Sequence, residues 1–80
     1  MKLIRKSGLT HENRSFEICV YDDGSRYQVA GFEKGKKKTV TYEVDHITNA
    51  DLLALVPNFC PYESLVGLVA RDITRGYIEK

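Results

Sequence analysis

Few residues of this 80-residue chain have the types and spacing that catalysis requires. His11 lies in a polar segment and His46 directly follows an expected strand, so we interpret both as surface residues. Cys60 stands between Phe59 and Pro61, and no recognisable motif places a histidine beside it. A nucleophilic cysteine needs a neighbouring base, so we interpret Cys60 as a small packing residue. The sequence therefore predicts a protein that is not an enzyme and has no catalytic residue.

Metal and phosphate sites are not indicated either. Asp22 and Asp23 belong to an expected turn with no third ligand nearby in the sequence. The two cysteines and two histidines match no zinc spacing, and we interpret Cys19 and Cys60 as free thiols. The segment 35–37 lacks the frame of a phosphate-binding loop. We expect no cofactor and no metal ion.

The densest run of charge is Lys-Gly-Lys-Lys-Lys at 34–38. Such a run can contact nucleic-acid phosphates or an acidic protein groove, or it can be a solvated hairpin tip that protects a sheet edge. The net charge is only +1, but residues 1–38 hold nine Lys/Arg and five Asp/Glu, whereas residues 39–80 hold three and six. A nucleic-acid-binding domain is usually more basic overall. Binding of nucleic acid or of a regulatory protein through 34–38, helped by Arg26, is therefore the alternative function.

Length and composition predict one globular domain over residues 1–80. Hydrophobic residues make up 42% of the chain, which is enough to form a core. No apolar run approaches the roughly 18 residues that a membrane span needs. The N-terminus has no apolar stretch of signal-peptide length, so the expected location is the cytoplasm.

Residues 15–21 show the clearest strand pattern, in which apolar and other side chains alternate. The side chains predicted to face the core are Phe16, Ile18 and Val20. The Asp-Gly pair at 23–24 predicts a hairpin turn. Residues 26–32 form the return strand, in which Gly31 indicates a bulge or a close approach of another element.

Two further strands complete a predicted sheet over about residues 2–45. Residues 37–45 alternate at period two, and the segment 2–6 is typical of an edge strand protected by lysines. The core-facing residues of the later strand are predicted to be Val40, Tyr42 and Val44. We interpret residues 8–14 as a polar connection.

The hydrophobic pattern then changes period and predicts two helices. Thr48 or Asn49 can cap a first helix over about residues 49–56, which Pro57 ends. A second helix over about residues 61–75 has apolar side chains spaced by three and four. These are Leu65, Val66, Val69 and Ile73, and Gly76 is the expected stop. The expected fold is α+β, a four-stranded antiparallel sheet in ββββαα order with two C-terminal helices packed on one face.

Tyr21 lies on the opposite register from the core-facing side chains of its strand. An exposed tyrosine among charged neighbours is a typical interface anchor, because it offers a large contact area at low entropy cost. The alternative is that it pairs across strands with Phe32 or Gln28. The residues predicted to bind a partner, on or beside the outer sheet face, are Tyr21, Glu17, Lys6, Arg26, Gln28 and Glu33.

Three stretches of the N-terminal third form a shared pattern. They are Met-Lys-Leu-Ile-Arg at 1–5, Leu-Thr-His-Glu-Asn at 9–13 and Ile-Cys-Val-Tyr-Asp-Asp-Gly-Ser at 18–25. This pattern resembles the small phage-encoded anti-CRISPR inhibitor of the type I-F surveillance complex, and Gly35-Lys36 extends it. That family has nearly the same length and the same order of strands followed by helices. The helical half shows no convincing identity.

The resemblance implies a sheet backed by two helices, no enzymatic activity and binding to the backbone subunits of the surveillance complex (Cascade). We expect the protein to be a monomer. Inhibitors of this kind keep target DNA from the guide RNA and use an exposed sheet face that includes the tyrosine matching Tyr21. Lys6 replaces a second aromatic of the family, and Glu33 matches an acidic contact residue only approximately. These departures leave the subtype open, and a related complex such as type I-C is the alternative.

Two other hypotheses remain open at this point. The chain can be a regulator that pairs with a second copy of itself through an edge strand. It can also be an enzyme that depends on Cys60.

Overall fold

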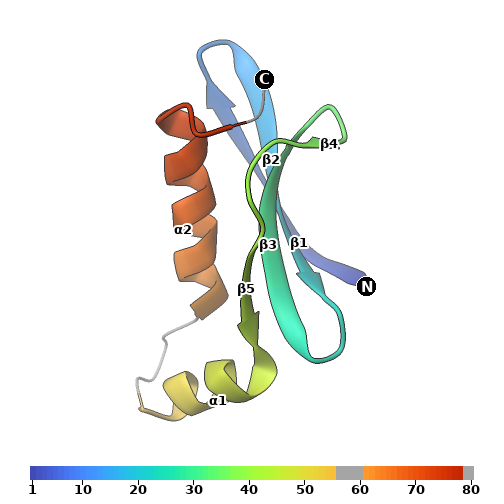
Figure 1. Cartoon of the computed structure of the whole chain (residues 1–80), viewed down its shortest axis with the longest axis vertical. Helices are drawn as coiled ribbons and strands as arrows, with labels where there is room; N and C mark the ends of the chain where they lie inside the picture. The colour runs from blue at the N-terminus through green and yellow to red at the C-terminus, as the bar shows by residue number, and fades with distance from the viewer. Residues whose placement is uncertain (56–60, 79–80) are drawn as a thin grey trace.

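A computed structural model describes residues 1–55 and 61–78 and shows the α+β class that the sequence predicts. Five strands are followed by two helices (Figure 1). The elements are β1 (Lys2–His11), β2 (Arg14–Asp22), β3 (Arg26–Glu33), β4 (Lys36–Lys37), β5 (Tyr42–Asp45), α1 (His46–Leu55) and α2 (Pro61–Thr74). Within the described part of the chain, no helix is long and apolar enough to cross a membrane.

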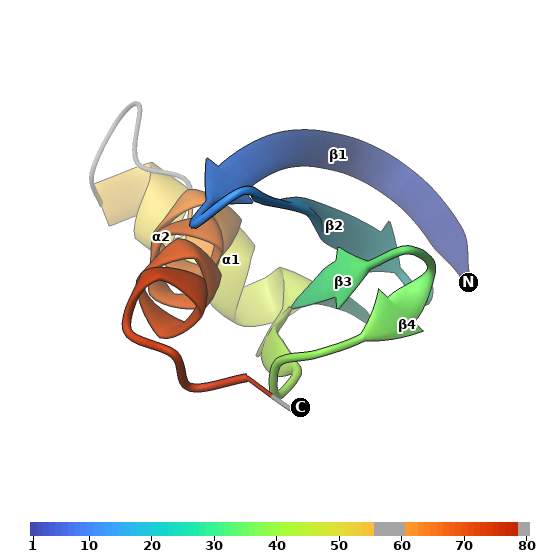
Figure 2. The ribbon, with the colours of Figure 1, turned by 90° about the horizontal axis from the view of Figure 1, so that it is seen from above.

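All neighbouring strands of the sheet are antiparallel, in the order β1-β2-β3-β4. β4 and β5 share one edge of β3: β4 pairs with residues 32–33 and β5 with residues 26–29. Figure 2 shows that β1 is strongly curved and that its N-terminal end lies on the side of the sheet away from α2. Because β1 lies at one end of the strand order, it is an edge strand, as the lysines in its sequence predict.

β1 is longer than the sequence pattern indicates, and the prediction of a polar connection at 8–14 is wrong. The strand runs to His11, which pairs with Arg14 across a two-residue turn. Glu12 and Asn13 form that turn with φ values of 51° and 65°. Two successive residues with positive φ give the twist that suits a tight hairpin, and asparagine tolerates this conformation well.

The strand predicted at 37–45 is interrupted between β4 and β5. At this point β3 forms a hydrogen bond with a side chain, where a regular strand would offer its backbone. Thr39 Oγ1 accepts a hydrogen bond of 2.8 Å from the N–H of Gly31 and donates one of 3.0 Å to the carbonyl of Val40. Thr39 is thus buried, whereas Val40 is 63% exposed, which reverses the predicted faces of these two residues. Tyr42 packs against the core as predicted.

The core lies between α2 and one face of the sheet. Its buried members are Phe16, Ile18, Val20, Val29, Val69 and Ile73. α2 also buries a carboxylate, because Asp72 is 5% exposed and accepts a hydrogen bond of 2.6 Å from the hydroxyl of Tyr42. This bond raises the pKa of Tyr42 and fastens α2 to β5.

α1 begins earlier in the sequence than predicted, whereas α2 begins where it was predicted. α1 starts at His46, three residues earlier than predicted, because Asp45 Oδ1 accepts a hydrogen bond of 2.6 Å from the N–H of Thr48. This bond lowers the pKa of Asp45. Thr48 therefore lies inside the first turn and is not the cap. α2 begins at Pro61, as predicted, and the predicted stop at residue 57 lies outside the described residues.

Gly76 ends α2 as its sequence position predicts. Its φ is 79°, and its N–H donates to the carbonyl of Ile73 at 3.2 Å. The N–H of Tyr77 donates to the carbonyl of Asp72 at 2.8 Å, which completes a Schellman motif. The chain then continues past the end of α2, where Tyr77 is 65% exposed.

The helices are placed differently on the sheet. Figure 1 shows α2 alongside the strands, whereas α1 lies crosswise at the end of the sheet where β2 turns into β3. Ile47 and Leu55 of α1 are 77% and 78% exposed. Among the described side chains, the helical contribution to the buried core thus comes from α2.

We expect Gly31→Ala to lower the free energy of unfolding by about 1–3 kcal/mol. A Cβ at this position would lie 3.0 Å from Thr39 Cγ2 and 3.1 Å from both Ile73 Cδ1 and Val69 Cγ1, so three buried neighbours would have to move. Urea unfolding measures the effect. Gly8→Ala is the matched control, because a Cβ there meets nothing within 4 Å. Equal stability of the two variants would contradict the tight approach at Gly31.

Candidate functional site

The outer face of the sheet, opposite α2, brings together most of the predicted binding residues. Tyr21 on β2 lies opposite Gln28 on β3, Glu17 lies opposite Phe32, and Lys6 on β1 lies opposite Cys19. Side chains alternate between the two faces of a strand, so residues two apart in sequence share this face. The outer face is therefore built from three adjacent strands.

Two aromatic rings dominate the outer face. Tyr21 and Phe32 are half-buried, and their ring centroids lie 6.2 Å apart at an interplanar angle of 70°. This edge-to-face geometry is favourable for aromatic pairs. Cys19 and Ala30 form the cross-strand pair that lies between the two rings. They are on the outer face but are only 5% and 3% exposed. Tyr21 thus makes one of the cross-strand contacts that the sequence suggested.

A hollow of about 400 Å³ opens beside this aromatic pair. It is lined by Met1, Tyr21, Gln28, Ala30, Phe32, Lys37 and Thr41. Burial raises the pKa of the Tyr21 hydroxyl and that of the Cys19 thiol, so both groups are neutral at physiological pH. The hollow therefore combines apolar walls with a few polar groups, as small binding sites commonly do.

Charged pairs border the aromatic region. Lys6 Nζ lies 2.8 Å from Glu17 Oε2, and this hydrogen bond raises the pKa of Lys6. Both side chains are about half exposed, so the pair adds little stability and remains available to a partner. The border of the face is polar while its centre is apolar, an arrangement typical of protein interfaces.

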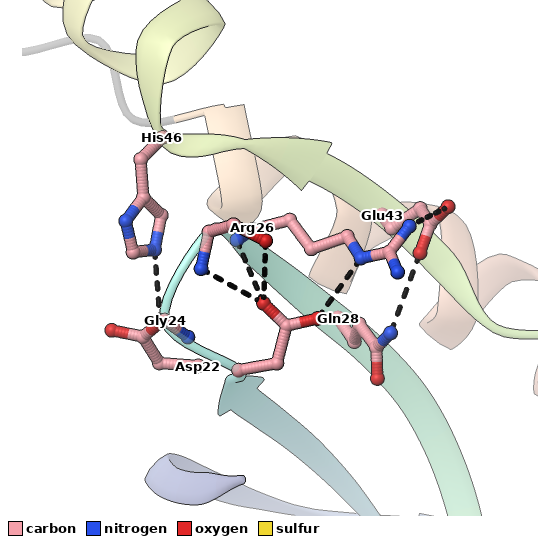
Figure 3. Close-up of polar contacts among 8 residues, drawn as sticks. Asp22, Gly24, Arg26, Gln28, Glu43 and His46 are labelled. Carbon is pink, nitrogen blue, oxygen red and sulfur yellow. Dashed lines mark hydrogen bonds and ion pairs between the residues drawn. The ribbon is translucent and has the colours of Figure 1, made fainter.

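Arg26 organises a second charged group at the start of β3 (Figure 3). Its guanidinium contacts Asp23 Oδ2 at 2.9 Å and Glu43 Oε1 at 3.1 Å, and Gln28 Nε2 lies 3.4 Å from Glu43 Oε2. Asp23 Oδ1 also accepts bonds from the backbone N–H groups of Ser25 and Arg26. These bonds hold the pKa of Asp23 well below its usual range. Arg26 is thus held rigidly beside the outer face.

His46 lies near the same hairpin but belongs to the helix side of the sheet. Its Nε2 is 2.9 Å from Asp22 Oδ1 (Figure 3), and its ring lies 4.5 Å from that of Tyr27. No group of three His, Cys, Asp or Glu side chains suited to a metal ion occurs among the described residues. His46 here connects α1 to the sheet. Cys60 lies outside the described residues.

Glu33 is not part of the outer face. Gly31 faces α2, and Glu33, two residues later on the same strand, lies on that side as well. Arg14 holds it through two hydrogen bonds of 2.8 and 2.6 Å, and these bonds lower the pKa of Glu33. The guanidinium of Arg14 also lies 5.0 Å from the ring centroid of Phe16. The prediction that Glu33 lies on or beside the outer sheet face is therefore wrong.

The structure also separates the lysine run 34–38 from Arg26. Arg26 begins β3, whereas Lys34 and Gly35 form the turn after its other end, with φ values of 51° and 80°. The two groups lie at opposite ends of a strand of eight residues. The lysine run and Arg26 therefore do not form one compact cluster of positive charge.

Phe32 and Thr41, which both line the hollow, were not among the site residues predicted from the sequence. Phe32 was considered only as a partner of Tyr21, although it shares the sequence parity of Gln28 and Ala30 and therefore their face. Thr41 joins the hollow because the chain between β4 and β5 leaves the regular strand path. Strand parity could have identified Phe32, but no local signal predicts the position of Thr41.

Comparison of the chain with family models, with curated proteins and with solved structures found no match. The α+β fold with an antiparallel sheet is established by the structure, whereas the resemblance to a CRISPR inhibitor stays a prediction.

We expect Asp23→Asn to reduce stability at neutral pH and to lose this effect in acid. The folded chain lowers the pKa of Asp23, so its stabilising contribution is complete above about pH 5 and is lost progressively below about pH 4. Urea unfolding at pH 7 and at about pH 3 should show a gap between variant and wild type that narrows in acid. Asp51→Asn, on the exposed surface of α1, is the control. A gap of constant size would contradict the ionic role of Asp23.

Proposed function

We propose that the chain is a non-catalytic protein that binds a protein partner through the outer face of its sheet. The observation that supports this most is the hollow of about 400 Å³ beside the edge-to-face pair of Tyr21 and Phe32. α2 packs on one face of the sheet (Figures 1 and 2), and by strand alternation this aromatic centre lies on the other face. Aromatic side chains in a partly dry centre supply most of the binding energy at many interfaces.

The charged border suits recognition of a protein surface. Lys6 with Glu17, and Arg26 with Glu43, place both signs of charge around the aromatic centre. Such a border contributes more to the rate of association and to the choice of partner than to affinity. Because the hollow lies beside the aromatic pair of this face, a protruding side chain of a protein partner is the occupant that we favour.

The partner in this proposal is a type I CRISPR surveillance complex in the cytoplasm of a bacterial host. This part rests on the sequence resemblance, in which the tyrosine matching Tyr21 is a contact residue. Binding to the backbone subunits would keep target DNA from the guide RNA without any chemical step. The proposal needs no enzyme activity and no cofactor, and it requires only a monomer.

We expect Tyr21→Ala and Phe32→Ala each to weaken binding about 30-fold, since each removes an aromatic anchor worth about 2 kcal/mol. Purified type I-F and type I-C surveillance complexes are titrated with the protein, and binding of a labelled target DNA is followed by gel shift. The wild type should abolish DNA binding by at least one complex.

Ile47→Ala is the control, because Ile47 of α1 is 77% exposed and is not among the residues that line the outer hollow. Thermal unfolding of each variant verifies that the fold is kept. If the wild type leaves DNA binding by both complexes unchanged, the proposed partner is wrong. If the wild type inhibits and both outer-face variants inhibit equally well, the proposed surface is wrong.

A further inference from the structure

A second surface lies at the end of the sheet where β3 turns into β4. Lys34, Lys36 and Lys37 are exposed there, and Lys38 is half-buried. Lys37 Nζ donates a hydrogen bond of 3.0 Å to Thr41 Oγ1. Within the described part of the chain, none of these four lysines forms an ion pair.

The cations elsewhere on the sheet are mostly neutralised. Arg5 pairs with a glutamate of α2, and Lys6, Arg14 and Arg26 each pair with a carboxylate. Lys34 and Lys38 help to lower the pKa of Glu33, but this carboxylate is already held by Arg14 through two hydrogen bonds. The lysines of 34–38 therefore create a positive potential that Glu33, already paired with Arg14, offsets only in part.

A hollow of about 520 Å³ lies directly beside these lysines, between residues 37–41 and 76–78. Its lining includes Lys37 and Lys38 together with two exposed apolar side chains, Val40 and Tyr77. Their exposed fractions are 63% and 65%. The break in the strand at Thr39 and the glycine stop of α2 place these side chains next to the basic turn.

We infer that this end of the molecule binds single-stranded nucleic acid. Lysine ammonium groups would contact the backbone phosphates, and the ring of Tyr77 would stack on a base, which is how many proteins hold single strands. The described residues of this surface form a turn and an open hollow, and they include no helix or long ribbon that could enter the major groove of a duplex. The inference concerns the opposite end of the sheet from Arg26 and does not depend on the proposed partner of the outer face.

The experiment measures fluorescence anisotropy of a labelled oligothymidine of about 15 nucleotides, a length typical of such sites. The salt concentration is varied from about 50 to about 200 mM. K34Q/K36Q/K38Q removes three phosphate contacts, so the slope of log affinity against log salt should become shallower by about 2. Tyr77→Ala should weaken binding about tenfold through the loss of stacking.

Two controls make the result specific. Lys2→Gln removes an exposed lysine at the start of β1. It should leave the affinity within about twofold of wild type and the salt slope unchanged. Tyr21→Ala removes a tyrosine from the outer face and should leave oligonucleotide binding unchanged. Lys37 borders both hollows and is therefore kept in every variant. Thermal unfolding verifies that the triple variant is folded.

The outcomes separate this inference from the proposed function. Weaker oligonucleotide binding by Tyr77→Ala, together with unchanged oligonucleotide binding by Tyr21→Ala, supports the basic end as the site. Equal or tighter binding of a duplex of the same sequence would overturn the assignment to single strands. An unchanged salt slope in the folded triple variant, or no binding by the wild type at low salt, would overturn the site itself.

Discussion

The close approach of α2 to β3 at Gly31 is the constraint on which much of the structure depends. Side-chain atoms of α2 and of Thr39 lie so near the backbone there that a Cβ would meet three of them at 3.0–3.1 Å. Thr39 is part of this contact, and its hydroxyl accepts the hydrogen bond from the N–H of Gly31. In a regular fourth strand, a backbone carbonyl would accept that bond. The strand is therefore broken between β4 and β5, and Val40 is turned outward. One tight contact inside the molecule thus shapes the hollow at the basic end.

Strand alternation explains which part of this arrangement could be predicted from the sequence. The pattern at 15–21 placed Phe16 in the core and Tyr21 on the outer face, because the direction of a side chain in a strand is fixed by local backbone geometry. The same rule failed at Thr39 and Val40, where a side-chain hydroxyl competes with the backbone for a hydrogen bond. Applied to β3, the rule places Glu33 on the helix side with Gly31, and there Glu33 meets Arg14 from another strand.

The ends of the elements were less predictable than the elements themselves. The turn at Glu12 and Asn13 lacks the Asn-Gly or Asp-Gly pair that usually indicates a two-residue hairpin, so the second half of β1 was mistaken for a connection. Asp45 ends a strand and caps a helix at once, and a local pattern assigns such a residue to one element only. Gly76 was predictable because a glycine that follows an amphipathic helix commonly ends it in the left-handed conformation.

The outer face and the helix face place different demands on the same strands. The helix face is filled by large residues such as Phe16 and Val29, and a change of volume there disturbs the core. On the outer face, the small residues Cys19 and Ala30 lie opposite each other beneath the rings of Tyr21 and Phe32. The hollow exists because Ala30 does not fill it. Since adjacent residues of a strand point to opposite faces, the outer face can change its shape while the packing under α2 is kept. A strand pair of this kind lets a small domain of 80 residues carry a variable binding surface on a fixed core.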